Sequence, residues 1–124
     1  MSEWTAADLD RIGSATELEI TTRRADGSLR PYLPIWVVRV GDELFVRSWR
    51  GQAGAWYRHA RQRPDGRVRA GGAERDVTFE LPPTVPAEDI DRAYRAKYGR
   101  YGDTYVGPMT GPGARAATVR LMAR

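Results

Sequence analysis

Short apolar runs separated by glycine-containing turns constrain the fold of this chain more than any other feature. Residues 17–24 alternate between apolar and polar side chains, which is the period of a β-strand. An Asp-Gly pair at 26–27 and a Gly-Asp pair at 41–42 separate this run from two further runs, and such pairs are strong turn signals. The segment 17–49 therefore predicts three antiparallel strands joined by short turns.

The residues of the middle run, 30–40, restrict where this segment can lie in the sheet. Pro31 and Pro34 confine its first half to a sheet edge or a bulge, because proline cannot donate to a strand ladder. Residues 35–38 are Ile-Trp-Val-Val, which are apolar on both faces. This half of the strand is expected to be buried on both sides, as in a closed or half-closed barrel.

The rest of the chain adds a second hairpin, a closing strand and three helices. The expected strands are 67–70, 74–81 and 116–122, and the expected helices are 4–12, 51–62 and 87–98, the first with Thr5 as its N-cap. Residues 99–114 are rich in glycine and contain two prolines, which predicts a lid or binding loop. The 124 residues thus predict one α+β domain over 1–124, a small six-stranded antiparallel barrel with N-terminal, inserted and late helices.

Composition excludes several classes of function. The chain has no cysteine and one histidine, His59, so thiolate metal sites, cysteine nucleophiles and zinc sites with several imidazoles are ruled out, and we expect no metal site. The net charge is +4, and the arginines are interspersed with acidic residues instead of forming a basic stripe. This pattern argues against nucleic acid as a partner and suits a small anionic ligand. No apolar run reaches membrane-spanning length and no signal-peptide pattern is found, so we expect a cytoplasmic protein without a membrane partner.

One segment, residues 47–58, concentrates residues suited to a cofactor. It carries three arginines, a serine, two glycines and three aromatic residues at the point where an expected strand is followed by an expected helix. Arginine forks and free backbone N–H groups at a helix start suit a phosphate, and flat aromatic side chains suit a ring system. The segment therefore predicts a nucleotide-like cofactor site.

Residues 22–38, followed by Gly-Asp-Glu-Leu-Phe-Val-Arg-Ser at 41–48, resemble the split-barrel flavin and deazaflavin oxidoreductases. The resemblance is to the deazaflavin-dependent nitroreductase-like members, and it is nearest to an uncharacterised bacterial family within or beside that superfamily. It covers about residues 17–81 and the last strand. It implies a split β-barrel that forms a homodimer and binds FMN or a deazaflavin in a groove that includes the dimer interface.

The resemblance also implies roles for individual residues of the 47–58 segment. The residues expected at the phosphate are Arg47, Ser48, Arg50, Gly51 and Gln52, and those expected near the ring or sugar chain are Trp49 and Trp56. The chain departs from the pattern at 54–55, where Gly-Ala replaces a lysine and a proline, and at 59, where histidine replaces asparagine.

Five residues are candidates for contact with a substrate. His59 is the side chain whose unperturbed pKa lies near neutrality. Phenols can donate to a developing anion, which adds Tyr94, Tyr98, Tyr101 and Tyr105, and of these Tyr98 and Tyr101 are predicted to be catalytic. Each has a structural alternative: a solvated histidine on an arginine-rich helix, and tyrosines that pack the late helix onto the barrel. The arginines can likewise pair with acidic residues at the surface. The tryptophans can fill the core or a dimer interface, and we expect Trp36 to lie in the core.

These features favour an oxidoreductase that uses FMN or a deazaflavin to transfer hydride to a small organic acceptor. The absence of visible acid–base machinery fits this reading, because the cofactor carries the chemistry. Two alternatives stay open. The first is a cofactor-free split barrel that binds or isomerises a small apolar molecule in the same groove, and the second is a non-catalytic dimeric interaction module.

Overall fold

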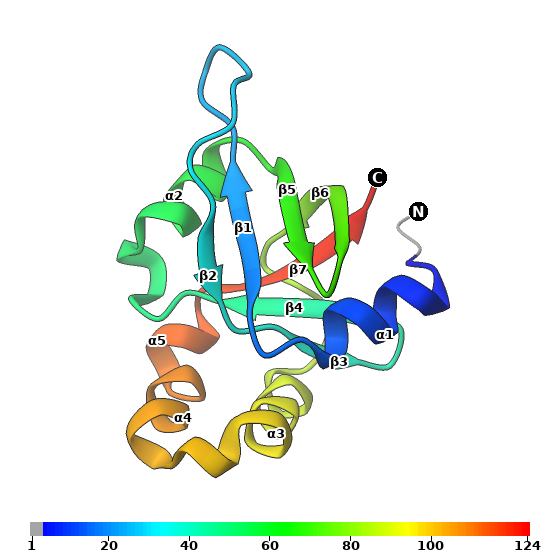
Figure 1. Ribbon diagram of the computed structural model, residues 1–124. Helices are drawn as coiled ribbons and strands as arrows, with labels where there is room; N and C mark the ends of the chain where they lie inside the picture. Colours follow the sequence, from blue (N-terminus) through cyan, green and yellow to red (C-terminus); the bar gives the residue numbers. More distant parts are fainter. Residues whose placement is uncertain (1–3) are drawn as a thin grey trace.

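One antiparallel sheet of seven strands organises the protein, which was analysed as a computed structural model that describes residues 4–124 (Figure 1). The strands are β1 (Leu18–Thr22), β2 (Leu33–Ile35), β3 (Val38–Val40), β4 (Glu43–Arg47), β5 (Asp65–Ala70), β6 (Ala73–Glu80) and β7 (Thr118–Ala123). Their order in the sheet is β2-β1-β5-β6-β7-β4-β3, and every neighbouring pair is antiparallel.

The connection between β2 and β3 makes this sheet a barrel. The two strands lie at opposite ends of the strand order, yet only Trp36 and Val37 separate them in the chain. A link of this length spans at most about 11 Å, so the two edges of the sheet must curl toward each other. The result is a barrel that is split between β2 and β3, and the predicted α+β split-barrel class is confirmed.

The strand count and the first meander were predicted wrongly. The segment 30–40 was expected to be one strand, but it breaks at Trp36 into β2, which pairs with β1, and β3, which pairs with β4. The barrel has seven strands instead of six for this reason. The predicted edge position is confirmed for Pro34, because β2 pairs on one side only.

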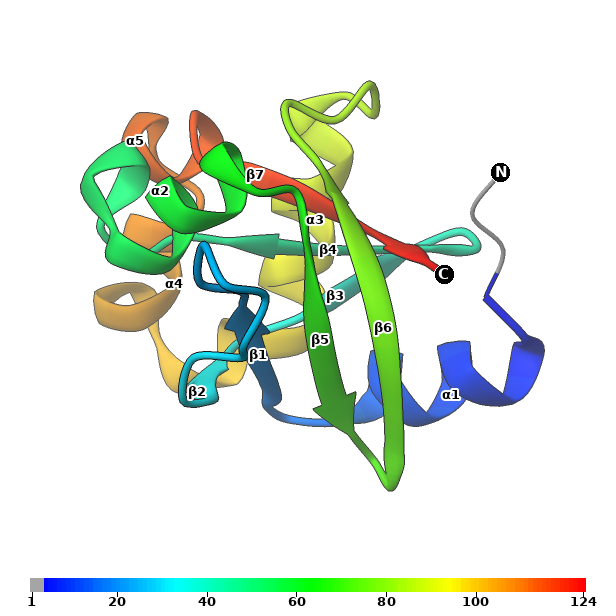
Figure 2. The ribbon, with the colours of Figure 1, turned by 90° about the horizontal axis from the view of Figure 1, so that it is seen from above.

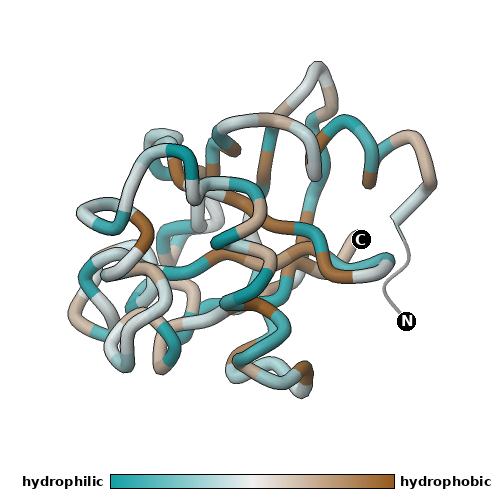
Figure 3. The backbone as a smooth tube through the Cα atoms, turned by 90° about the horizontal axis from the view of Figure 1, so that it is seen from below, coloured by the Kyte–Doolittle hydropathy of each residue, from teal (hydrophilic) through white to brown (hydrophobic). Residues whose placement is uncertain are grey.

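The interior of the barrel is one hydrophobic cluster. Residues of alternating strand positions, such as Leu44 and Val46 of β4, point into it together with residues of α1 (Ala6–Ser14) and α2 (Ala55–Gln62). Hydrophobic and hydrophilic residues change over short distances along the chain (Figure 3), as strands with two different faces require. The α1 helix begins as predicted, with the Thr5 hydroxyl accepting a hydrogen bond from the Asp8 amide.

A second cluster lies on the outer face of β3 and β4. Here Val38 and Phe45 pack against Ile90 and Tyr94 of α3 (Ala87–Tyr98), which confirms the predicted late helix. Figure 1 shows α3, α4 (Asp103–Met109) and α5 (Pro112–Arg115) below β4, and in the view from above α3 passes behind β4 (Figure 2). β4 is therefore covered on both faces.

The glycine-rich segment 99–114 is not the predicted loop. It forms the short 3-10 helix η2 (Gly99–Tyr101) followed by α4 and α5. Val106 and Met109 of α4 are buried against α3, and this tertiary contact outweighs the weak helix propensity of glycine and proline. No helix within residues 4–124 has the length and apolar character needed to cross a membrane.

Candidate functional site

A cleft of about 600 Å³ opens beside β2, at the split in the barrel. Its walls come from β2, the end of β4, the 3-10 helix η1 (Gly51–Ala53), the start of α2, and α4. The lining residues are Glu17, Leu33, Pro34, Ile35, Trp36, Arg47, Ser48, Trp49, Arg50, Ala53, Gly54, Ala55, Trp56, Arg58, Tyr105 and Met109. The predicted cofactor segment 47–58 thus does border a cavity.

One part of the cleft gathers groups that bind anions. Arg50 and Arg58 are exposed, and within the described part of the chain their guanidinium groups have no hydrogen-bond or ion-pair partner. The amides of Ala55, Trp56 and Tyr57, in the first turn of α2, have no backbone acceptor within residues 4–124. Such N–H groups and the positive end of a helix dipole favour a bound anion.

Ser48 and Gly54 bring this helix start close to the end of β4. A Cβ atom at position 54 would overlap the Ser48 hydroxyl oxygen, so glycine at this position permits the approach without a change at Ser48 or at the start of α2. In the described region the Ser48 side chain has no hydrogen-bond partner, although the residue is buried at the wall of the cleft. Its hydroxyl is thus available to a ligand.

The aromatic residues of the cleft differ in their exposure. Trp49 is 55% exposed, whereas Trp56 is buried and meets Tyr57 edge to face. Trp36 was expected in the core, but it lines the cleft and stacks on Tyr98 with ring centroids 3.9 Å apart and the planes nearly parallel. With the aliphatic residues of β2, these rings form an apolar wall suited to a flat ring system.

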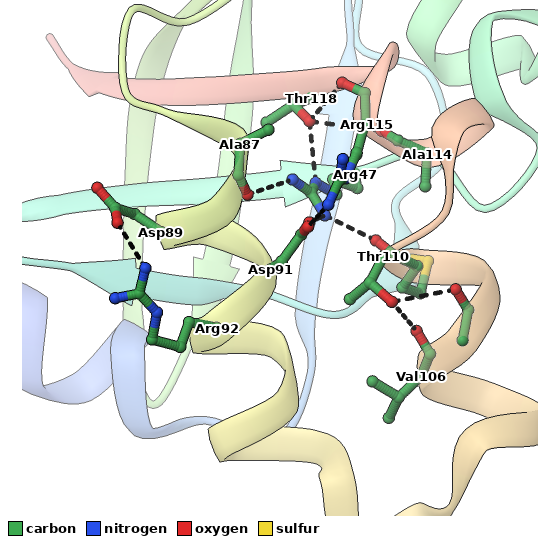
Figure 4. A network of polar contacts seen from close by, with 12 residues as sticks. Arg47, Ala87, Asp89, Asp91, Arg92, Val106, Thr110, Ala114, Arg115 and Thr118 are labelled. Atoms are coloured by element: carbon green, nitrogen blue, oxygen red, sulfur yellow. Dashed lines mark hydrogen bonds and ion pairs between the residues drawn. The ribbon is translucent and has the colours of Figure 1, made fainter.

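Arg47 was predicted to hold a phosphate, and the structure corrects this. Its side chain is fully buried: Nε donates to the Thr118 hydroxyl (2.9 Å), and Nη1 donates to the Met109 carbonyl (2.9 Å) and to the Asp91 carboxylate (Figure 4). The remaining terminal nitrogen donates to the Ala87 carbonyl at 3.3 Å. Four of the five N–H donors of this guanidinium are therefore bonded inside the protein, which leaves it poorly placed to hold a phosphate.

Asp91 joins two arginines in this network. Its second carboxylate oxygen accepts from Arg115, whose side chain is partly exposed. Burial on its own would raise the pKa of Asp91, but the hydrogen bonds from Arg115 and Arg47 outweigh it and lower the pKa below its ordinary value. The network ties β4, α3, α4 and α5 together beneath the cleft.

Two further cofactor predictions are corrected by placement. Gly51 is buried and does not line the cleft; it adopts a positive φ of 64°, and a Cβ there would lie 3.1 Å from the Gly113 carbonyl oxygen. The Gln52 amide donates to the Ala116 carbonyl at 3.3 Å and also lies outside the cleft lining. Both residues shape the turn between β4 and α2, outside the cleft lining.

The predicted catalytic residues lie outside the cleft lining. Tyr98 is buried, and its hydroxyl accepts from the Val37 amide (3.1 Å) and donates to the Thr16 carbonyl (2.7 Å). Burial raises the pKa of Tyr98 to about 12, which makes it a poor proton donor near neutrality. The contacts of Tyr98 fit its alternative role of packing the late helix onto the barrel, and its catalytic role stays a prediction.

Tyr101 and His59 lie beside the cleft without lining it. Tyr101 is 41% exposed, and its ring lies 5.9 Å from that of Trp36, which does line the cleft. His59 is half-buried on α2, and burial together with the charges of Arg30 and Arg58 lowers its pKa. Neither residue is positioned by this structure for acid–base work in the cleft.

Two lining residues, Glu17 and Leu33, had no signal in the sequence, and only the curl of the sheet brings them to the cleft. Tyr105 and Met109 belong to the segment 99–114 that was predicted as a lid or binding loop, and the position of α4 brings them to the same cleft. Arg58 belongs to the segment that the sequence singled out, but its role depends on which face of α2 meets the cleft.

The sequence matches one family model over residues 8–121, that of a family described as uncharacterized protein conserved in bacteria (DUF2255). A comparison of the sequence with curated proteins finds no match.

Solved structures share the fold at low sequence identity. The heme storage protein HutZ from Vibrio cholerae is 13% identical with a TM-score of 0.61, over 89% of this chain and 82% of its own. A FAD-binding protein (mll6688) from Mesorhizobium loti is 17% identical with a TM-score of 0.56, over 98% and 91%. A protein described as F420 reductase is 20% identical with a TM-score of 0.52, over 94% and 90%. The split-barrel resemblance inferred from the sequence is confirmed by these neighbours.

Proposed function

The chain belongs to the bacterial family DUF2255, and we propose that it binds FMN or a deazaflavin coenzyme in the cleft and uses it as an oxidoreductase. One observation carries the proposal. The cleft joins two arginines and a helix start, for which residues 4–124 supply no ion-pair partner and no side-chain cap, to an apolar, aromatic wall. This is the combination that a phosphate-bearing ring cofactor needs.

The phosphate is assigned to the end of β4 and the start of α2. Arg50 and Arg58 supply charge-assisted donors, the Ser48 hydroxyl adds a further donor, and the amides of residues 55–57 point their free N–H groups out of the helix. These groups replace the set predicted from sequence, from which Arg47, Gly51 and Gln52 are removed.

The ring system is assigned to the wall formed by β2 and Trp36. Leu33, Ile35 and Trp36 exclude water from one side, and Trp56, Tyr105 and Met109 also line the cleft. A bound flavin or deazaflavin supplies hydride transfer, while the protein supplies binding, orientation and exclusion of water. We further propose a small organic molecule as the hydride acceptor.

The structural neighbours support a cofactor but leave its identity to experiment. Those named above are described by FAD, F420 and heme, so the same fold accommodates different ring systems in different proteins. The anion-binding groups of this cleft suit a phosphate in particular.

Fluorescence titration tests the proposal. Purified protein is titrated with FMN and, separately, with a deazaflavin coenzyme, and we expect saturable quenching in the micromolar range for one of them. Arg58→Ala is expected to weaken binding roughly tenfold or more, because it removes a charge-assisted contact. Arg95→Ala is the matched control, since Arg95 is exposed on α3 and does not line the cleft.

The outcomes separate the rival functions. If neither cofactor binds at high micromolar concentration, the oxidoreductase proposal falls. A cofactor-free protein that binds an apolar molecule in the same cleft would then be indicated if such a ligand binds equally to wild type and to Arg50→Ala. If neither a cofactor nor an apolar ligand binds, the remaining alternative is indicated, a non-catalytic dimeric interaction module.

We also propose that the protein acts as a homodimer. Trp49 and Tyr105 are each 55% exposed at the cleft, and large exposed aromatic side chains are typical of interfaces. Sedimentation velocity should give about twice the mass of one chain, and Trp49→Arg should shift the distribution toward the monomer. A monomer at all concentrations would contradict this.

A further inference from the structure

The cleft contains one carboxylate, and it is separated from the arginines. Glu17 lines the cleft and is exposed, and its side chain has no hydrogen-bond or ion-pair partner within the described residues. Arg50 and Arg58 line the same cleft, yet neither lies within 4.0 Å of it, which is the limit for an ion pair. The cleft therefore has an acidic group and basic groups that do not neutralise each other.

The acidic group lies at the aromatic end. Glu17 directly precedes Leu18, which pairs with Ile35 at the end of β2, and Trp36 follows Ile35. The neighbouring carbonyl of Thr16 accepts a hydrogen bond from the same tyrosine on which Trp36 stacks. Glu17 and Trp36 are thus brought to the same end of the β1–β2 pair.

The α2 helix, which carries Arg58, lies toward the other end of β1. Arg30 donates its amide to the carbonyl of Thr22, the last residue of β1, and its charge also lowers the pKa of His59 on α2. Figure 1 likewise shows α2 beside the Thr22 end of β1, away from its start. The five residues of β1 span about 14 Å, so a ligand that contacts both ends must be elongated.

We infer that Glu17 is a specificity-determining residue that accepts a hydrogen bond from a ring N–H of the cofactor. The inference rests on the proposed function. An ionised carboxylate only accepts hydrogen bonds, so it favours a ring edge that carries a donor. FMN and deazaflavins both present one N–H, at N3 of the pyrimidinedione ring, and their phosphate lies on a chain that leaves the opposite part of the molecule.

This contact would select among flat rings. The carboxylate is acceptor-only, so a ring with a donor at this edge gains a charge-assisted hydrogen bond that a ring without one does not make. The apolar wall by itself cannot provide it, because apolar contacts distinguish poorly between rings of similar shape. Glu17 thus adds chemical selectivity to a cleft whose other ring contacts are mostly apolar.

Methylation of the ring nitrogen gives a direct test that needs no variant. We expect wild-type protein to bind FMN about 10- to 100-fold more tightly than N3-methyl-FMN, the loss expected for a hydrogen bond to a charged group. Glu17→Ala should weaken FMN binding by a similar factor and bring the ratio of the two dissociation constants close to one. Glu17→Gln, which keeps an acceptor oxygen without the charge, should lie between them.

A second glutamate variant serves as the control for this test. Glu88→Ala removes an exposed glutamate of α3 that does not line the cleft, and it should leave both dissociation constants unchanged. If a cofactor binds but Glu17→Ala binds it as tightly as wild type, or more tightly, this inference is overturned and the proposed function stands. If wild-type protein binds neither FMN nor the deazaflavin, the proposed function fails and the inference fails with it.

Discussion

The guanidinium of Arg47 donates to the carboxylate of Asp91 in the protein interior, where both side chains are at most 1% exposed. The pair links the end of β4 to the first half of α3, and Arg115 of α5 binds the same carboxylate (Figure 4). Arg47 also holds the carbonyl of Met109, a residue that lines the cleft. The residue that the sequence offered as a phosphate ligand instead holds the wall of the site in place.

Removal of Asp91 is expected to destabilise the fold strongly. Asp91→Ala leaves the buried charge of Arg47 unpaired, and the loss of one partner of a buried ion pair costs about 3–5 kcal/mol. Urea unfolding followed by circular dichroism measures the change in free energy of unfolding. Asp89→Ala is the control: Asp89 pairs with Arg92 at the surface, so its loss should cost less than about 1 kcal/mol. Equal small effects of both variants would contradict the structural role given to Asp91.

Tyr98→Phe is expected to reduce stability while leaving cofactor affinity nearly unchanged. The variant removes the hydroxyl that bridges the Val37 amide and the Thr16 carbonyl, and a buried polar group left without its partner costs about 1–3 kcal/mol. Urea unfolding and fluorescence titration measure the two quantities on the same sample. A large loss of cofactor affinity at unchanged stability would contradict the structural role given to this tyrosine.

Lys97 is expected to lose its proton at an unusually low pH. Burial lowers its pKa to about 8 from the ordinary 10.5, although its ammonium group donates to the Gly13 and Val37 carbonyls. Between these two values the unfolded chain binds more protons than the folded one, so the contribution of Lys97 to stability rises as pH increases from about 8 to about 10.5.

Nuclear magnetic resonance can follow this titration without ambiguity, because Lys97 is the only lysine in the chain. Protein labelled with ¹³C at lysine Cε gives one side-chain signal, whose shift reports the proton. A midpoint above pH 10 would show that the two carbonyl contacts outweigh burial.

Gly54→Ala is expected to weaken cofactor binding about tenfold or more. The added methyl group overlaps the Ser48 hydroxyl, so the serine must turn or the start of α2 must shift, and either change misplaces donors of the anion site. Gly107→Ala is a matched control, because a Cβ at this position of α4 has no atom within 4 Å among the described residues. Unchanged affinity in Gly54→Ala would show that the phosphate does not bind at this junction.

The local signals of the sequence were dependable where a few neighbouring residues decide the conformation. The Thr5 cap, the Asp-Gly turn at 26–27 and the helix over 87–98 are all present in the structure. Each depends on contacts within a few residues, such as a side chain that caps a helix or a glycine that accepts a positive φ. The split-barrel class followed from the same strands together with the resemblance.

The break of the middle run at Trp36 and the helices of 99–114 could not be predicted in this way. β2 and β3 separate because each finds a different partner, β1 and β4, and these pairings depend on how the whole sheet curls. The helices α4 and α5 form where Val106, Met109 and Ala114 meet buried surfaces supplied by other elements. Residues distant in the chain provide that stabilisation, so a short window of sequence does not contain it.

By itself, the sequence determined that a cofactor-like segment follows β4 and that the chain is an antiparallel α+β barrel. The tertiary structure decided which arginines of that segment are free. Strand side chains alternate between two faces, so Arg47 leaves β4 beneath α3 and becomes buried, whereas Arg50, beyond the end of the strand, remains exposed. Because α3, α4 and α5 cover the outer face, an arginine that looked available in the sequence is buried and bonded to groups inside the protein.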